Sequence, residues 1–127
     1  MRSKAKVKQS AATDSLNALI IDSIQDIKGK KIRLLDMREL HDAPADFFIV
    51  CEGDSSTQVR AIADHVYRRV NEEAHVKPLH LEGANSSRWV LLDYLNTVVH
   101  IFFPEARQFY DLESLWGDAR VQEFDTL

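Results

Sequence analysis

The apolar run at residues 47–51 is the feature that most limits what this chain can fold into. Five apolar residues follow one another between Asp46 and Glu52, so neither side of an extended strand there has a polar position for water. Strands of this kind lie in the middle of a sheet whose two faces are covered by helices. The run therefore predicts an α/β fold built around a fully buried strand.

The residues after this run predict the start of a helix. Gly53 and Asp54 break the apolar pattern, and Ser55 with Gln58 three positions later forms a capping box. The helix that follows has an apolar stripe at helical spacing. Its members are Val59, Ile62, Ala63, Val66 and Val70.

The remaining hydrophobic patterns predict the other helices and strands of a single α/β domain. A first helix is expected from Thr13 or Asp14 to Gly29, and a last helix after Pro104. Together with residues 47–51, the expected strands are residues 32–36, 79–82, 88–93 and 97–103. This order predicts a mixed five-stranded sheet with packed helices. We expect residues 1–13 to be a disordered basic extension, residues 14–116 the folded domain, and residues 117–127 an acidic tail.

Composition excludes several classes of protein. A net charge of −4 argues against broad phosphate binding, which leaves a basic footprint. No apolar run approaches the roughly 18 residues of a membrane span, so no membrane partner is expected. Cys51 has no second cysteine to pair with, which indicates a reducing compartment, the cytoplasm. No histidine stands at a metal-ligand spacing from another histidine or from Cys51, so no metal site and no cofactor are predicted.

A nucleotide- or phosphate-handling enzyme is the alternative that the loop Gly53-Asp54-Ser55-Ser56 raises. The loop joins a buried strand to a helix N-terminus, where anions can bind. Nucleotidyl transfer also needs paired carboxylates to hold divalent metal, and the chain contains no Asp-x-Asp. The nearest substitutes are Glu52 with Asp54, and Asp111 with Glu113. We predict no catalytic residue.

The segment after Pro104 carries more apolar surface than a one-sided helix needs. As one helix, its apolar arc is roughly double the usual stripe, and Glu113 falls inside that arc. The residues of the arc are Ala106, Phe109, Tyr110, Leu112, Leu115 and Trp116. Aromatic side chains beside a carboxylate are typical of a protein interface. The alternative is a helix that breaks near Tyr110 into two pieces with different orientations.

A second group of this kind lies on the strand at residues 88–93. Trp89, Leu91 and Asp93 share one face by simple alternation. An acid at the end of a buried strand, on the face that also carries a tryptophan, indicates a rim where the sheet meets solvent. A purely structural role for Trp89 fits the sequence equally well.

These residues belong to a long set in which the chain resembles the Iojap family, the ribosomal silencing factors. The resemblance runs from about Asp14 to Trp116, in this order and spacing. The matching residues are Ala45-Asp46-Phe47-Phe48-Ile49-Val50-Cys51-Glu52-Gly53-Asp54-Ser55-Ser56, Val59, Ile62-Ala63-Asp64-His65-Val66, Leu81-Glu82-Gly83, Trp89, Asp93, Val98-Val99-His100-Ile101-Phe102, Arg107, Tyr110-Asp111-Leu112-Glu113 and Leu115-Trp116.

The resemblance implies both a fold and a function. The fold is a nucleotidyltransferase-like mixed sheet that lacks the enzyme's metal carboxylates. The function is binding to the large ribosomal subunit through its protein fourteen, which sterically blocks the small subunit and lowers translation when nutrients are short. Carried over residue by residue, the contact surface consists of Trp89, Asp93, Tyr110, Leu112, Glu113 and Trp116. A further contact with ribosomal RNA, and a weak homodimer of the free protein through the same aromatic residues, are left open.

Overall fold

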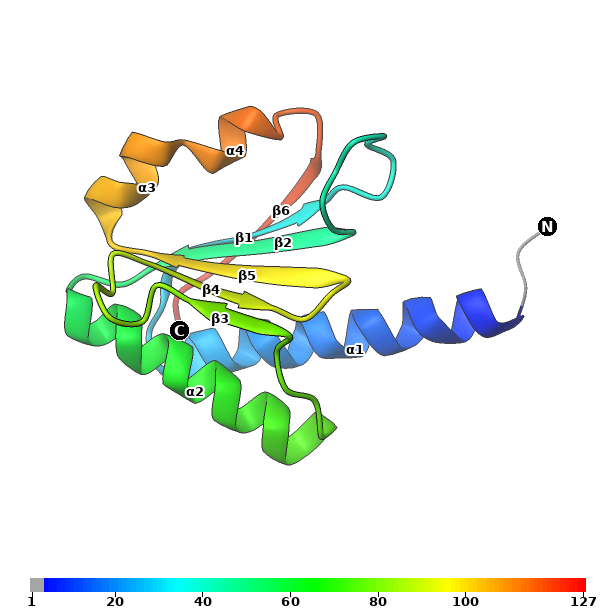
Figure 1. The fold of residues 1–127 in the computed structure, drawn as a ribbon, viewed down its shortest axis with the longest axis horizontal. Coiled ribbons are helices and arrows are strands. Elements are labelled where there is room, and N and C mark those ends of the chain that lie inside the picture. The colour runs from blue at the N-terminus through cyan, green and yellow to red at the C-terminus, as the bar shows by residue number, and fades with distance from the viewer. Residues whose placement is uncertain (1–3) are drawn as a thin grey trace.

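The structure is a computed structural model that describes residues 4–127, with side chains described from Ala12 onward. It contains four helices and six strands in the described residues (Figure 1). The helices are α1 (Lys4–Asp26), α2 (Ser56–Ala74), α3 (Pro104–Tyr110) and α4 (Leu112–Leu115). The strands are β1 (Lys30–Asp36), β2 (Phe47–Glu52), β3 (His80–Glu82), β4 (Trp89–Asp93), β5 (Thr97–Phe102) and β6 (Arg120–Phe124).

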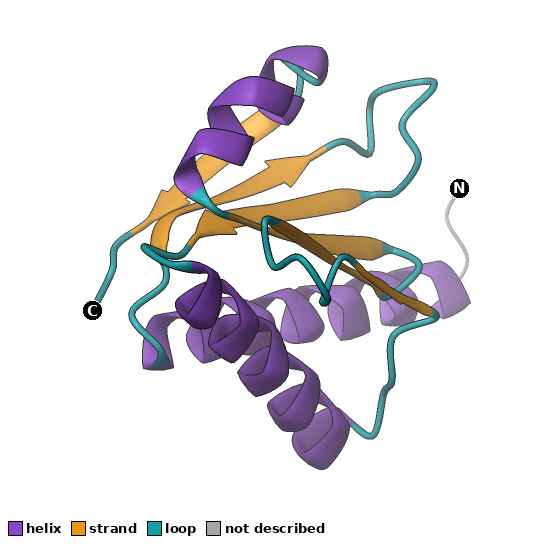
Figure 2. Ribbon diagram, turned by 60° about the vertical axis from the view of Figure 1, so that its left-hand side comes forward, coloured by secondary structure: helices purple, strands orange, loops and turns teal. Residues whose placement is uncertain are grey.

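These elements form three layers around one mixed sheet, which confirms the predicted fold class. The strand order is β3-β4-β5-β2-β1-β6, and only the central pair, β2 with β5, is parallel. Helices α1 and α2 cover one face of the sheet, and α3 and α4 lie over the other (Figures 1 and 2). None of the described helices combines the length and apolar character that a bilayer crossing requires.

Strand β2 is buried along its whole length, as its sequence predicts. Alternate side chains point to opposite faces of a strand, so β2 supplies both layers of the core. Ile49 and Cys51 pack with residues of α1 and α2, whereas Phe48 and Val50 pack with residues near α3 and α4. Burial also raises the pKa of the Cys51 thiol to about 12, so this cysteine stays protonated at neutral pH.

Helix α2 begins where the capping residues predict. Ser55 is its N-cap, and the Ser55 hydroxyl accepts a hydrogen bond from the Gln58 amide at 3.1 Å. The Gln58 side chain accepts in return from the Asp54 amide at 2.6 Å. The five residues of the predicted apolar stripe are all buried, so α2 presents to the sheet the face that the sequence indicates.

The start predicted for the first helix, at Thr13 or Asp14, is wrong because α1 begins at Lys4. Thr13 does not cap the helix in the structure; it is buried, and its hydroxyl lies 3.5 Å from the Asn96 side-chain nitrogen. One turn later, Asn17 accepts a hydrogen bond from the Thr97 hydroxyl at 2.6 Å. Thr13, which looked like a helix start, therefore contacts the β4–β5 turn, and Asn17 contacts the first residue of β5. The expected disorder of residues 1–13 is wrong for residues 4–13, which belong to α1, and residues 1–3 lie outside the described residues.

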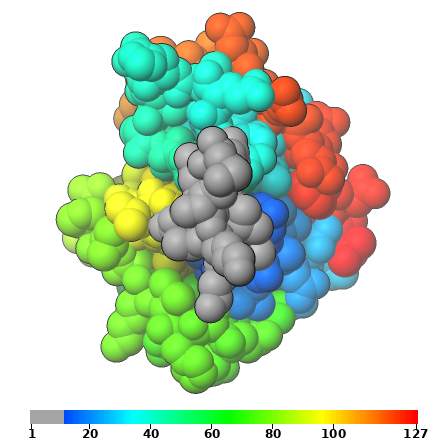
Figure 3. Space-filling model, turned by 90° about the vertical axis from the view of Figure 1, so that its right-hand side faces the viewer, coloured from blue at the N-terminus to red at the C-terminus, as the bar shows by residue number. Residues whose placement is uncertain are grey.

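The acidic tail and the five-stranded sheet are also corrected by the structure. Residues 120–124 form β6, which pairs antiparallel with β1 at the edge of the sheet. Four of its five residues are exposed, so the strand lacks the hydrophobic alternation that reveals a buried strand in a sequence. Figure 3 shows the C-terminal residues at the surface, beside the connection between β1 and β2.

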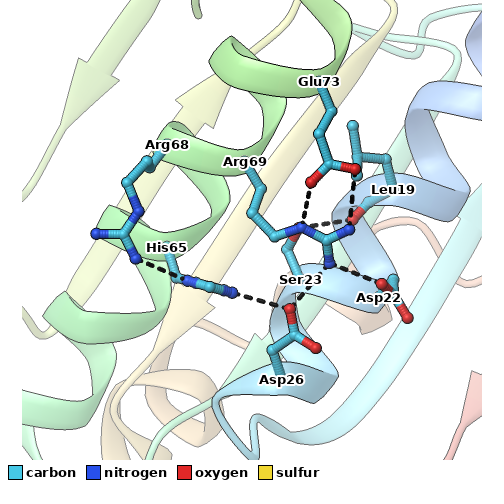
Figure 4. Close-up of polar contacts among 8 residues, drawn as sticks. All are labelled: Leu19, Asp22, Ser23, Asp26, His65, Arg68, Arg69 and Glu73. Carbon is cyan, nitrogen blue, oxygen red and sulfur yellow. Dashed lines mark hydrogen bonds and ion pairs between the residues drawn. The ribbon is translucent and has the colours of Figure 1, made fainter.

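An ion cluster on Arg69 joins α1 to α2 (Figure 4). The Arg69 guanidinium lies 2.7 Å from Asp22 and 2.9 Å from Asp26 of α1, and 2.6 Å from Glu73 of α2. His65 adds a contact of 2.9 Å to Asp26. The Arg69 side chain is only 20% exposed, so its charge depends on these carboxylates for compensation.

We predict that Arg69→Met lowers the free energy of unfolding by about 1–2 kcal/mol, because it leaves three carboxylates without their shared cation. Urea denaturation measures the change, and Arg60→Met, at an exposed position of the same helix, is the matched control. Added salt should narrow the difference in unfolding free energy between Arg69→Met and Arg60→Met, because it screens the repulsion between the carboxylates. Equal stability of the two variants would show that the cluster contributes nothing.

Candidate docking surface

Aromatic side chains from β2, β4, β5 and α3, together with Trp116 at the end of α4, meet on the side of the sheet that carries α3 and α4. The Trp89 ring lies 4.7 Å from the ring of Tyr110 and 5.0 Å from that of Phe102, measured between centroids. Phe48 and Trp116 meet edge to face at 6.4 Å. We call these five residues the aromatic cluster. It brings together three of the six residues carried over from the family: Trp89, Tyr110 and Trp116.

His100 lies beneath this cluster and fixes the indole of Trp89. The Trp89 Nε1–H donates to His100 Nδ1 at 3.1 Å, and His100 is only 3% exposed. Burial lowers the pKa of His100 to about 3, so the ring is neutral at physiological pH. Its remaining ring nitrogen, Nε2, is buried without a hydrogen-bond partner within the part of the chain that the structure describes.

The β4–β5 pairing explains why these side chains meet. Trp89 stands opposite Phe102 and Leu91 opposite His100, so all four project from the same face of the sheet. Sequence reasoning treated His100 only as a single histidine and missed its role. Pairing the two predicted strands as a hairpin, with alternation applied to both, was the signal that could have found it.

The last helical segment is broken at Asp111, which confirms the alternative of two pieces. Asp111 has left-handed backbone angles, φ 48° and ψ 48°, and ends α3. Leu112 and Trp116 consequently pack against the core, while other apolar side chains point outward. Phe109 is 81% exposed, Tyr110 53% and Leu115 71%. Exposed apolar side chains within a short stretch of chain, here on α3 and α4, are typical of a binding surface.

Glu113 is held by two arginines of its own chain. Arg107 of α3 donates from Nε to Glu113 Oε1 at 2.8 Å and from Nη2 to Oε2 at 3.1 Å. Arg33 of β1 donates to Oε2 at 2.7 Å. Arg107 also contacts Glu52 at 3.2 Å, and both of these side chains are 10% exposed. We call Glu52, Arg107, Glu113 and Arg33 the ionic clasp.

The clasp sets the ionisation of Glu113. Burial by itself would raise the pKa of this carboxyl, but the hydrogen bonds and charges of Arg107 and Arg33 outweigh it and lower the pKa below its usual value. Glu113 is therefore ionised at neutral pH and neutralised from within the chain. Sequence reasoning gave Glu113 a surface role and did not identify Arg33.

Asp93 lies apart from the aromatic cluster. It is at the far end of β4 from Trp89, four residues and therefore about 13 Å along the strand. Its Oδ1 accepts a hydrogen bond from the Leu95 amide at 2.8 Å, in the turn to β5. The side chain is half-buried, as expected at a rim where the sheet meets solvent.

The carboxylates that an enzyme would need for metal are engaged elsewhere. Glu52 is bound by Arg107, and Asp54 pairs with Lys30 at 2.7 Å. Among the described residues, no group of three histidine, cysteine, aspartate or glutamate side chains is placed to hold a metal ion. The amides at the start of α2 are partly taken by the Ser55 and Gln58 side chains. The loop thus caps its own helix.

The family profile described as "Ribosomal silencing factor during starvation" matches residues 9–127. The chain is 38% identical over 114 residues to the ribosomal silencing factor RsfS of Halalkalibacterium halodurans, covering 90% of this chain and 96% of that protein. It is 41% identical over 102 residues to the Chromobacterium violaceum protein of the same name, covering 80% of this chain and 82% of that protein. The chain belongs to the ribosomal silencing factor family.

Solved structures agree with this assignment. A crystal structure of a Chromobacterium violaceum protein superposes with a TM-score of 0.77 at 40% identity, covering 82% of this chain and 85% of that one. A Bacillus halodurans structure gives a TM-score of 0.74 at 34% identity, covering 87% and 99%. The plant relative named Iojap, from Zea mays chloroplasts, is 38% identical, covering 80% of this chain but 44% of that protein. The family consists of translation regulators that act on the ribosome and are not enzymes.

We predict that His100 makes the protein lose stability as the pH falls below about 6.5. The unfolded chain binds a proton at its usual histidine pKa, whereas folded His100 binds one only near pH 3. Between these values the free energy of unfolding should fall by about 1.4 kcal/mol per pH unit from this residue. Above pH 6.5 both states are neutral at His100 and the contribution vanishes.

Urea denaturation from pH 7.5 to 4.5 measures this slope. His100→Asn keeps a hydrogen-bond acceptor for Trp89 and should have a shallower slope than the parent. His41→Asn, at an exposed histidine, is the matched substitution for comparison. A parent-like slope in His100→Asn would contradict the prediction.

Proposed function

We propose that this protein binds the large ribosomal subunit through its protein fourteen and sterically prevents the small subunit from joining. Bound there, it lowers translation when nutrients are short, and it acts in the cytoplasm. The family assignment supports action on the ribosome, and the resemblance described above supports the choice of partner. A mouse relative, 28% identical over 76 residues, is named "Mitochondrial assembly of ribosomal large subunit protein 1".

The observation that carries this proposal is the exposed apolar surface of α3 and α4. Phe109, Tyr110 and Leu115 expose more than half of their area, although the sheet beneath them is covered. A chain with a satisfied core gains nothing from three such side chains on 11 residues of helix. Burial against a partner accounts for them.

The residues carried over from the family take different roles in this surface. Trp89, Leu112 and Trp116 are half-buried and form a rigid floor, which keeps the entropy cost of docking small. Tyr110 stands on that floor, with its ring against Trp89, and contacts the partner directly. Asp93 is a rim carboxylate that faces basic side chains of the partner. Glu113 acts through the clasp, because both of its oxygens already accept hydrogen bonds from arginines.

We expect Leu115→Ser to weaken binding to large subunits by about tenfold, since it removes an exposed apolar side chain from the proposed docking surface. Leu115 is 71% exposed and has little buried area to lose, so the fold should be unaffected. The matched control is Leu127→Ser, a side chain of similar exposure near the end of α1. Subunit joining on sucrose gradients, with light scattering as a second readout, measures the effect. Normal inhibition of joining by folded Leu115→Ser would place the surface elsewhere.

Asp93→Asn should weaken binding mainly at low salt, by about threefold, because a rim charge acts through a screened field. The difference from the parent should fade as ionic strength rises. Asp64→Asn, an exposed carboxylate on α2 in the opposite layer, provides the comparison. A salt-independent loss in Asp93→Asn would mean that the turn at Leu95 was disturbed, and would argue against an electrostatic role.

A further inference from the structure

Arg33 joins the short helix α4 to the C-terminal strand β6. From the middle of β1 its guanidinium reaches in two directions. Its Nη1 donates to Glu113 of α4 at 2.7 Å, and its Nε donates to Glu123 of β6 at 3.0 Å. Glu123 stands directly opposite Arg33 in the register of the two strands, so the second contact is set by the sheet itself.

Helix α4 needs such a connection because it cannot hold its own position. It has four residues, which is about one turn, and a helix that short has almost no intrinsic stability. None of its residues is fully buried. Leu112 and Trp116 pack on the sheet, and Glu113 is the polar contact that fixes the helix from its other side.

The two arginines on Glu113 anchor α4 to different parts of the fold. Arg107 belongs to the preceding helix, α3. Its Nη1 also donates to the carbonyl of Lys31 in β1 at 2.9 Å. Arg33 belongs to the sheet and extends the connection to the strand that follows α4 in the chain. The stretch from α3 to β6 is therefore held at three points. These are Arg107 in α3, Glu113 in α4 and Glu123 in β6.

We propose that Arg33 is a positioning residue for docking, and that β6 serves the docking surface by holding Arg33 and α4 in register. This proposal rests on the proposed function for its ribosomal consequence. Arg33 touches no partner in this scheme. It fixes the direction in which α4 presents Leu115 and supports Trp116, so that the surface is ordered before the partner arrives. A preordered surface spends less of its binding energy on ordering.

The test is Arg33→Gln, which removes the charge and the Nη atom that reaches Glu113 but keeps a polar side chain. Its first readout is hydrogen exchange of the amides of Ser114 and Trp116, whose acceptors are the carbonyls of Asp111 and Leu112. Loss of a charge-assisted hydrogen bond should speed their exchange by about tenfold. Its second readout is large-subunit binding, which should weaken by about the same factor.

Arg38→Gln is the matched control. Its side chain is 45% exposed, against 42% for Arg33, and it pairs with Asp36, the last residue of the same strand, rather than with a residue of α4. Glu123→Gln removes only the β6 end of the connection and should shift both readouts in the same direction by a smaller factor. The midpoint of urea denaturation should remain close to that of the parent in all three, which separates local loosening of α4 from global unfolding.

The outcomes distinguish this proposal from the function on which it rests. If the amides of Ser114 and Trp116 exchange at the same rate in Arg33→Gln as in Arg38→Gln, Arg33 does not position α4, whatever the ribosome assay shows. If exchange rises but binding is unchanged, the order of α4 does not matter for docking and the proposal is wrong. If the parent itself fails to bind large subunits, the proposed function fails, while the exchange data still decide the structural role of Arg33.

Discussion

The parallel pairing of β2 with β5 is the interaction on which the rest of this structure depends. Both strands are buried along their full length, and each sends alternate side chains into two separate cores. Parallel neighbours need a crossover connection, and here α2 lies within it, packed on one face with α1. The antiparallel strands on both sides then extend this sheet, and each of its two faces carries its own hydrophobic core.

The two faces differ in how completely they are covered. The long helices α1 and α2 close one face with aliphatic side chains and an ion cluster. Short α3 and α4 cover the other with aromatic side chains and leave Phe109, Tyr110 and Leu115 exposed. If this exposed surface were also mobile, ordering it on binding would cost conformational entropy. The hydrogen bond of Trp89 to His100 and the contacts of Glu113 with two arginines hold this surface in place.

Sequence by itself determined the parts of this protein that depend on local pattern. The apolar run of β2, the Ser55 cap and the stripe of α2 follow from periodicity and backbone hydrogen bonding, which act over a few residues. The surplus apolar surface after Pro104 was visible for the same reason, and so was its break near Tyr110 as an alternative. The resemblance to the silencing factors rests on residues in fixed order, and it required no knowledge of their contacts.

Only the tertiary structure decided how distant residues meet. Arg33 and Glu113 are 80 positions apart, and the sequence around either residue gives no sign of its contact with the other. Strand β6 escaped prediction because an exposed edge strand is held by backbone pairing, which carries no hydrophobic signal. Thr13 was read as a helix start because its contact with Asn96 is formed by folding. The two arginines that bind Glu113 could not be read from the sequence for the same physical reason: a charge looks free in a sequence until the fold brings its partners to it.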